Sequence, residues 1–323
     1  MKKLTKKFGF QLLEKMLEIR YFEEKIVDQY ARGTVPGLAH LYIGEEAVAV
    51  GACACLGEKD LITSTHRGHG HCIAKGADVN LMMAELFGKK TGYCKGKGGS
   101  MHIASIEVGM LGAMGIVGSG SPIAVGSALA AKIRKTKQVT IAFMGDASTN
   151  TGAFHESANF ASLHKLPLVF ICENNLYGIS VRINRHMPLK NVAERAAGYA
   201  MPGVIVDGND VIAVYKTVDK AVNAARDGKG PTFIECKTYR TRGHFEGDPN
   251  QGLRYRTKAE MEKWSGKCPI KRFKKEMLKQ ALIKEKELKK LEKSVKQKIE
   301  AAMDFANKSP FPEGKETLED LFA

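Results

Sequence analysis

The stretch from Val139 to Tyr177 constrains the fold of this chain more than any other. It holds two short apolar runs rich in branched residues, Val139 to Met144 and Leu166 to Cys172, separated by a segment whose apolar residues recur at helical spacing. Strand, helix and strand of these lengths form a parallel βαβ unit. A right-handed crossover brings the carboxyl ends of both strands to one edge of the sheet. The sequence therefore predicts an α/β fold built on a parallel sheet.

Each strand of this unit is followed by a polar residue. Asp146 follows the first strand and Asn175 the second, so we expect both side chains at the edge where open α/β sheets bind ligands. A carboxylate, a carboxamide and nearby main-chain carbonyls form an oxygen-only donor set, which suits Mg²⁺ or Ca²⁺. The helix predicted to begin near Thr151 would direct free N–H groups toward a phosphate there. Alone, either residue could be an ordinary cap or turn residue; the pair favours a metal and phosphate site.

The charge of the chain raises a different possibility, a basic scaffold or nucleic-acid-binding protein. The net charge is +15, yet residues 271–300 alone hold 12 Lys and Arg against 5 Asp and Glu. Apolar residues recur along this segment at helical spacing, which predicts a pair of helices with a solvated lysine face. No aromatic-interleaved basic platform accompanies it, so we expect no nucleic-acid partner. An acidic partner surface is an open alternative.

Hydropathy and cysteine usage predict a cytoplasmic protein. No apolar run reaches the ~18 residues that a membrane-spanning helix needs. The basic N-terminal segment is interrupted by charges and lacks a small-residue cleavage site, which argues against a signal peptide. The seven cysteines form no disulfide-like framework, and Cys53 and Cys172 lie in apolar stretches. We expect them to be buried thiols in a reducing compartment.

Histidines and arginines mark three further candidate stretches. His40 follows a predicted N-terminal helix and would, on its own, be a buried structural histidine. A strand-like run ends at HRGHGH, residues 66–71. This spacing could indicate zinc, but the flanking glycines favour a flexible loop that contacts an anion through Arg67. Residues 238–249 form a predicted loop rich in Arg, Gly and Asp, and its His244 is a candidate proton carrier.

The motifs GDASTNTG and ICENNLYG are the most specific in the chain. Together they resemble the signature of thiamine diphosphate enzymes, in which an aspartate and the second asparagine hold the metal that bridges to the diphosphate. The wider sequence resembles the alpha subunit of the first component of 2-oxo acid dehydrogenase complexes and of acetoin dehydrogenase. HRGHGH, where pyruvate-type relatives carry Tyr-Arg, and GHFEGD resemble the acetoin dehydrogenase branch. The resemblance implies a parallel-sheet thiamine diphosphate-binding fold with helices on both faces and a helical C-terminal tail.

The resemblance also assigns roles to particular residues. Mg²⁺ would be held by the Asp146 carboxylate, the Asn175 side chain and the Tyr177 main-chain carbonyl. Ala147 stands where the motif usually has glycine, so the turn must accommodate a Cβ close to the diphosphate. The implied cofactor-binding residues are His66, Arg67, Gly115, Val117, Asp146, Ala147, Ser148, Asn175, Tyr177 and His244, with backbone groups at Gly115 and Val117 holding the aminopyrimidine ring. The candidate catalytic residues are His66, His244 and His40.

Thiamine chemistry also needs a glutamate that hydrogen-bonds to the aminopyrimidine ring. This chain has no room for the second domain that would carry it, and the resemblance implies a separate beta subunit in a two-alpha, two-beta tetramer. We therefore expect an enzyme, active only with its beta subunit, that cleaves a small ketone, acetoin, to acetaldehyde and an acetyl unit passed to a lipoyl-bearing acyltransferase. Pyruvate or a branched-chain 2-oxo acid is the alternative substrate.

Position 66 bears on that choice. His66 either contacts the diphosphate, as the tyrosine of the relatives does, or it is the base for acetoin cleavage, a role that His244 could also fill. Phe245 stands where animal pyruvate enzymes carry a regulatory serine, which argues against that form of control.

The predicted domain organisation is simple. Residues 1–262 are expected to form the thiamine diphosphate- and Mg²⁺-binding α/β domain, beginning with an amphipathic helix over residues 8–31. Residues 263–323 are expected to be a lysine-rich helical extension of the same domain. Between them, strands at 203–206 and 231–235 should flank a helix over residues 211–226.

Overall fold

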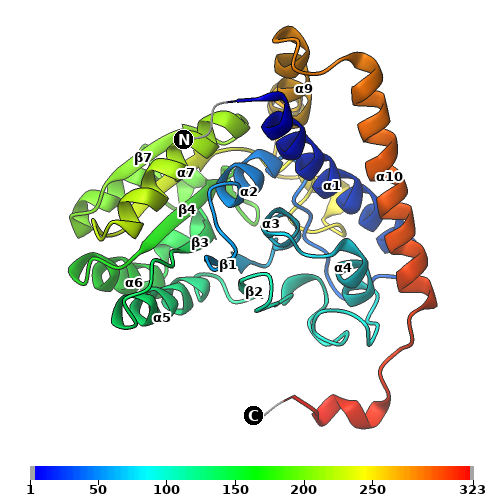
Figure 1. Ribbon diagram of the computed structural model, residues 1–323, viewed down its shortest axis with the longest axis horizontal. Coiled ribbons are helices and arrows are strands. Elements are labelled where there is room, and N and C mark those ends of the chain that lie inside the picture. The colour runs from blue at the N-terminus through cyan, green and yellow to red at the C-terminus, as the bar shows by residue number, and fades with distance from the viewer. Residues whose placement is uncertain (1–3, 321–323) are drawn as a thin grey trace.

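The centre of the computed structural model is a six-stranded, all-parallel sheet in the order β2-β1-β3-β4-β8-β7 (Figure 1). The structure describes residues 4–320, so the ends of the two predicted domain ranges lie outside the described residues. The strands of the sheet are β1 Leu61–Thr65, β2 Met110–Met114, β3 Thr140–Gly145, β4 Leu168–Asn174, β7 Gly203–Asp207 and β8 Thr232–Lys237. A small antiparallel pair consists of β5 Tyr177–Gly178 and β6 Val181–Arg182.

Helices cover both faces of the sheet, as predicted (Figure 1). They are α1 Lys6–Ala31, α2 Glu46–Cys53, α3 His69–Lys75, α4 Val79–Leu86, α5 Gly120–Ile133, α6 Gly152–Leu163, α7 Val211–Arg226, α8 Lys258–Ser265, α9 Pro269–Lys279 and α10 Glu285–Lys308. Alternate side chains of β4 enter two separate cores: Phe170 packs with the α5–α6 layer, and Ile171 with the layer that includes α1, α2 and α7. This division is what a strand buried on both faces requires.

The central unit has the predicted form. β3 leads through α6 into β4, and the two strands pair in parallel from Thr140 opposite Leu168 to Gly145 opposite Glu173. The Thr151 hydroxyl accepts a hydrogen bond from the Phe154 N–H and caps α6 at its start. The carboxyl ends of β3 and β4 therefore lie side by side at one edge of the sheet.

Strand β2 was not predicted. It lies at the edge of the sheet beside β1, and its pairing slips between Ile62 and Ser64, which face Met110 and Ala113. Gly112, with φ of +150°, interrupts the apolar run and weakens the strand signal in the sequence.

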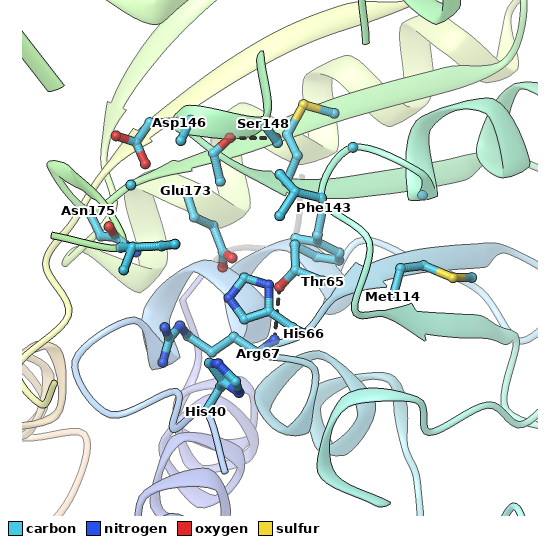
Figure 2. Close-up of a pocket in the computed structure, with 18 of the residues that line it drawn as sticks. His40, Thr65, His66, Arg67, Met114, Phe143, Asp146, Ser148, Glu173 and Asn175 are labelled. Carbon is cyan, nitrogen blue, oxygen red and sulfur yellow. Dashed lines mark hydrogen bonds between the residues drawn. The ribbon is translucent and has the colours of Figure 1, made fainter. Parts of the chain in front are cut away.

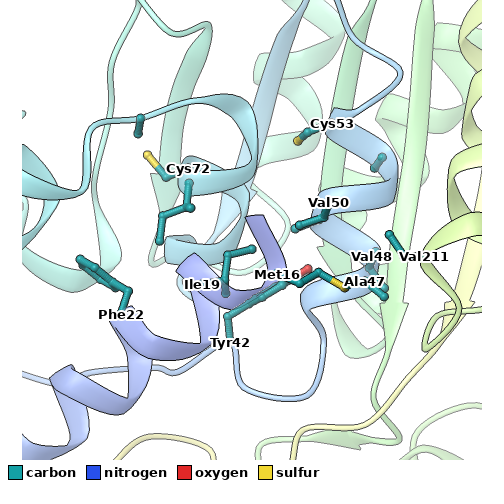
Figure 3. Close-up of a cluster of buried hydrophobic side chains, with 14 of the residues drawn as sticks. Met16, Ile19, Phe22, Tyr42, Ala47, Val48, Val50, Cys53, Cys72 and Val211 are labelled. Atoms are coloured by element: carbon teal, nitrogen blue, oxygen red, sulfur yellow. The ribbon is translucent and has the colours of Figure 1, made fainter. Parts of the chain in front are cut away.

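The long N-terminal helix covers one layer of this core (Figure 3). Met16, Ile19 and Phe22 of α1 are completely buried and lie beside Tyr42 and the residues of α2. Gly70 at the start of α3 makes room for the Tyr42 ring, because a Cβ at this position would lie 2.1 Å from its Cδ1. The amphipathic pattern of the N-terminal segment therefore predicted a true core element.

The lysine-rich C-terminal segment forms two helices, as predicted. α10 lies along α1 and α4 (Figure 1), and its apolar stripe joins the main core through Leu288, Val295 and Ile299. Lys298 forms an ion pair with the buried Glu18 of α1. The shared core is what a helical extension of the same domain requires, although the domain bounds stay a prediction. Across residues 4–320, no helix is long and apolar enough to cross a membrane.

Candidate functional site

A cavity of about 590 Å³ opens at the carboxyl edge of the sheet (Figure 2). Four neighbouring strands deliver its polar lining: His66 and Arg67 follow β1, Asp146 follows β3, Asn175 follows β4, and the loop with Arg240 and His244 follows β8. The order β2-β1-β3 means that the chain changes direction between β1 and β3. Open parallel sheets bind ligands at such a switch point.

Asp146 and Asn175 line this one cavity, as predicted (Figure 2). Both are buried, and the Asp146 Oδ2 atom has no hydrogen-bond partner among the described residues. The Asn175 Nδ2 group donates a hydrogen bond to Glu45 Oε1 at 3.2 Å. The Asn175 Oδ1 atom accepts one from the Tyr177 main-chain N–H at 3.4 Å. Tyr177 also lines the cavity, with its hydroxyl bonded to Glu260. Asp146 and Asn175 thus bring to one cavity side-chain oxygens of the kind a hard cation needs.

The turn after Asp146 is a short 3₁₀ helix over Ala147–Asn150. The Ser148 hydroxyl donates to the Gly145 carbonyl at 2.7 Å, and the Thr149 hydroxyl donates to the Asp146 carbonyl at 2.7 Å. These bonds close the turn tightly onto the strand end. The backbone here is right-handed, so alanine at position 147 carries no φ penalty.

The methyl group of Ala147 is accommodated by a glycine on a neighbouring strand. A Cβ on Gly178 would lie 2.6 Å from the Ala147 Cβ, a contact that cannot form without movement. The Cβ of Ala147 is thus accommodated on the side of the turn that faces β5.

This pairing yields a swap test. Gly178→Ala should lower stability by ~1–3 kcal/mol, as overpacking does, and adding Ala147→Gly should recover most of that loss. Thermal unfolding of the two variants, alone and combined, measures both effects. A double variant no more stable than Gly178→Ala would mean that the two positions do not share this space.

Three histidines gather at the cavity. The ring centroids of His40, His66 and His244 lie 4.7, 5.0 and 5.4 Å apart in the pairs 40–66, 40–244 and 66–244. Burial lowers the pKa of His66 and of His244 to about 3 and that of His40 to about 2, with Arg67 as the next cause. One nitrogen from each ring lies within 4.8 Å of the others. The adjacent guanidinium charges of Arg67 and Arg240 oppose a cation there and favour an anionic or neutral ligand.

Two arginines supply the positive charge. Arg67 is buried and donates to the Leu41 carbonyl at 2.6 Å and to the His244 carbonyl at 2.9 Å. Burial, with Arg240 as the next cause, lowers the pKa of Arg67 to about 10. Arg240, which the sequence analysis did not single out, is also buried, donates to the Ile179 carbonyl and lines the cavity. An anion between these two groups would be favoured.

Two buried carboxylates were also missed. Burial and the neighbouring Glu173 raise the pKa of Glu45 to about 8, and Glu45 Oε2 has no hydrogen-bond partner in the described part of the chain. Glu173 accepts from the Tyr42 hydroxyl and contacts His71 Nε2 at 3.0 Å. Glu173 directly precedes the asparagine pair of the motif, a position from which the sequence could have identified it.

The prediction of a flexible loop over residues 66–71 is wrong at its second half. His69 and His71 begin helix α3 and are completely buried. His69 contacts Glu23 at 3.0 Å through Nδ1 and Ser100 at 3.0 Å through Nε2. Both rings are structural because each already has polar partners on its two nitrogens. Only His66 and Arg67 reach the cavity.

Gly115 and Val117 lie at the mouth of the cavity. Val117 is 50% exposed and the intervening Ile116 is 78% exposed. Exposed apolar residues continue across the mouth at Ile179 and Val181. The cavity thus has a charged floor and an uncovered apolar rim.

Comparison with known proteins bears out the resemblance. A family model described as "Dehydrogenase E1 component" matches residues 14–315. The chain is 51% identical over 320 residues to the alpha subunit of acetoin:2,6-dichlorophenolindophenol oxidoreductase from Bacillus subtilis, covering 99% of this chain and 95% of the relative. It is 43% identical to the same-named subunit from Cupriavidus necator, with the same coverage. It is 42% identical over 326 residues to pyruvate dehydrogenase E1 component subunit alpha-3, chloroplastic, from Arabidopsis thaliana, covering 99% and 76%. With matches that span nearly its whole length, this chain belongs to the dehydrogenase E1 component family.

Proposed function

We propose that this chain is the alpha subunit of a thiamine diphosphate- and Mg²⁺-dependent enzyme that cleaves acetoin. The observation that carries the proposal is a buried, unpartnered Asp146 oxygen at a strand end beside Asn175, in a cavity that also holds two buried arginines. The 51% identity to an acetoin oxidoreductase subunit supports the choice of substrate. The enzyme would work in the cytoplasm, where its free thiols stay reduced.

The residues at the sheet edge fit a metal-bound diphosphate. A buried carboxylate oxygen without a partner is costly unless a cation or donor meets it. Asp146, Asn175 and the Tyr177 carbonyl would hold Mg²⁺, which prefers oxygen ligands. Arg67 and Arg240 would offset the diphosphate charge. Thiamine diphosphate, when bound, supplies the electron sink that lets a C–C bond beside a carbonyl break.

The chain's own residues would position the cofactor and the substrate. The backbone at Gly115 and Val117 would support the aminopyrimidine ring, while Ala147 and Ser148 would approach the diphosphate. His40, His66 and His244 form the wall where a small ketone would sit, and their lowered pKa values keep the rings neutral at neutral pH. The acyl unit would leave to a lipoyl group on an acyltransferase component.

The exposed apolar rim of the cavity supports the proposal that a partner subunit binds there. Ile116, Val117 and Ile179 would be desolvated by a beta subunit that closes the cavity and supplies the missing glutamate. Relatives of the chain are named as alpha subunits. A two-alpha, two-beta tetramer would bury this rim in both halves.

We expect the chain alone to be inactive and to bind thiamine diphosphate weakly, because half of the cofactor site is absent. The test compares purified alpha chain with the alpha–beta complex, using calorimetric cofactor titration and acetoin-dependent reduction of 2,6-dichlorophenolindophenol. In the control, the alpha chain is unfolded by heat and refolded together with the beta subunit, to show that the same alpha chain can form an active complex. Turnover by rigorously beta-free alpha chain would contradict the proposal.

Pyruvate is the second candidate substrate, favoured by the 42% identity to a pyruvate dehydrogenase subunit. The same dye assay with acetoin, pyruvate and a branched-chain 2-oxo acid ranks the substrates of the alpha–beta complex by kcat/KM. We expect acetoin to rank first because a proton-accepting histidine at position 66 suits the departure of acetaldehyde.

A further inference from the structure

His186 lies beside the proposed metal ligand Asp146 but belongs to no motif of the sequence. It follows a short 3₁₀ turn over Ile183–Arg185, just after β6, and lines the cavity. Its Nε2 atom lies 3.5 Å from Asp146 Oδ2. Both atoms are buried and neither has a hydrogen-bond partner among residues 4–320. Each atom is therefore a potential hydrogen-bond partner for the other.

The neighbours of His186 determine which of its nitrogens carries the proton. The Asn150 Nδ2 group lies 3.1 Å from His186 Nδ1 and 3.2 Å from the His186 main-chain oxygen. A carbonyl oxygen can only accept, so the amide must present its N–H₂ end to His186. On the other side, the Arg195 guanidinium donates to Asn150 Oδ1, and a guanidinium can only donate. Both contacts fix the same amide orientation.

The consequence for the imidazole is direct. Because Nδ1 accepts a hydrogen bond from Asn150, the proton of the neutral ring must be on Nε2. Nε2–H therefore faces the Asp146 carboxylate as a donor, and its lone pair is not available to a metal. Hydrogen bonds link Arg195, Asn150 and His186 in one direction, and the 3.5 Å contact from His186 would extend this chain to the Asp146 carboxylate.

We propose that His186 is a positioning residue that binds Asp146 Oδ2 and thereby aims the other carboxylate oxygen at the metal. The inference rests on the proposed function, because it assumes a divalent cation at Asp146. Outer-shell donors of this kind orient metal ligands, and their loss costs ~10–100-fold in metal affinity. At 3.5 Å the contact is longer than a formed hydrogen bond, so the two groups must close by a few tenths of an ångström when the site is loaded.

Gly178 lies between the His186 ring and the Asp146 turn. A Cβ on Gly178 would lie 3.8 Å from His186 Nε2 and 2.6 Å from the Ala147 Cβ. The small residue at position 178 therefore leaves room for the Ala147 methyl group beside the ring. The His186 side chain is 15% exposed, so the packed wall restrains the ring.

The experiment measures Mn²⁺ affinity of the alpha–beta complex with thiamine diphosphate by electron paramagnetic resonance, which counts free Mn²⁺ and needs no turnover. His186→Leu should weaken Mn²⁺ binding by ~10–100-fold. His186→Gln, which keeps an N–H donor, should recover most of this loss. His164→Leu, at an exposed histidine after α6 and away from the cavity, is the matched control and should bind as wild type does.

The outcomes separate the inference from the proposed function. Wild-type affinity in His186→Leu would overturn the inference alone, whereas failure of the wild-type complex to bind Mn²⁺ would overturn the proposed function with it. Pulsed spectra of the wild type should lack the ¹⁴N coupling of a directly bound imidazole, and a coupling that is lost in His186→Leu would make His186 a ligand, against the inference.

Arg195 provides a test of the chain itself, because it does not line the cavity. Arg195→Met should weaken Mn²⁺ binding in the wild-type background by freeing the Asn150 amide to turn. It should have little further effect in His186→Leu, since coupled residues are non-additive. Equal effects in both backgrounds would overturn the chain from Arg195 to Asp146.

Discussion

Replacing Asp146 with alanine is expected to abolish Mg²⁺-dependent thiamine diphosphate binding by the alpha–beta complex. The change removes the charged oxygen ligand, and Mg²⁺ is a hard dication whose binding depends most on charge. Asn175→Ala removes a neutral ligand and should weaken binding less. Each substitution should lower cofactor affinity by more than ~10-fold, the smallest effect typical of losing a residue that only hydrogen-bonds to a metal ligand. Isothermal titration with Mg²⁺ present and absent measures them.

Thermal unfolding adds a sharper expectation for Asp146→Ala. The wild-type Asp146 oxygen is buried without a partner, and an uncompensated buried carboxylate is destabilising. The cofactor-free variant should therefore unfold at or above the wild-type temperature, while losing the rise in temperature that cofactor gives wild type. Unchanged Mg²⁺ dependence in either variant would show that the ligands are misassigned. A wild-type complex with no cofactor affinity would instead favour the basic-scaffold alternative.

The part of the fold that carries the site was predictable because it rests on strong periodicity. The β3–α6–β4 unit begins and ends close to where the apolar runs do, since each run is buried on both faces of a parallel sheet. The meeting of Asp146 and Asn175 then follows from the handedness of one crossover. The amphipathic stripes of α1 and α10 were predictable for the same reason.

The rest of the site depends on contacts between distant segments, which no local pattern reveals. Arg240 reaches the cavity only because β8 lies beside β4, a neighbour relation that the order of the chain does not dictate. Glu45 reaches Asn175 from the loop before α2. His186 returns to Asp146 through the β5–β6 turn. Each of these residues looks ordinary in the sequence, and topology alone makes it part of the site.

The histidine run shows how a correct motif can support a wrong local structure. The glycines Gly68 and Gly70 suggested flexibility, yet Gly70 is required because the Tyr42 ring occupies the space of its Cβ. Close packing and a flexible loop both use glycine, and the sequence does not distinguish them. The charged partner of the ring at position 69, Glu23, lies in α1, far along the chain. The helix therefore forms for tertiary reasons.

The structure also changes the argument about His66. An ordinary imidazole has a pKa of ~6.5, whereas burial and then Arg67 lower the pKa of His66 to about 3. A lowered pKa leaves the accepting form present at all pH values above about 3, but it also makes the ring a weak base. A diphosphate beside Arg67 and Arg240 would offset the guanidinium charges and so raise the pKa of His66, while burial, the larger cause, would continue to lower it. The ring would then be a stronger base when the site is loaded than when it is empty.

His66→Tyr is therefore expected to lower acetoin cleavage by the ~10²–10⁴-fold typical of a lost general base. Acetaldehyde can leave acetoin only after the carbinol hydroxyl loses a proton, whereas carbon dioxide leaves pyruvate without one. A tyrosine, with an ordinary pKa of ~10, would not accept that proton at neutral pH. The tyrosine hydroxyl can still donate to the diphosphate, so cofactor affinity and any residual pyruvate activity should be spared. Dye reduction with each substrate measures the two rates, and calorimetric titration measures the affinity.

His244→Gln is the companion variant, because His244 lies across the same wall, 5.4 Å from His66 between ring centroids. If His66 is the base, the acid limb of the acetoin pH profile should vanish in His66→Tyr and persist in His244→Gln. The reverse pattern would transfer the role to His244. Acetoin and pyruvate rates that fall together in His66→Tyr would mean that His66 only holds the diphosphate. An unchanged acetoin rate in both variants would mean that the proton leaves to a residue outside this wall, with the beta subunit as the next place to look.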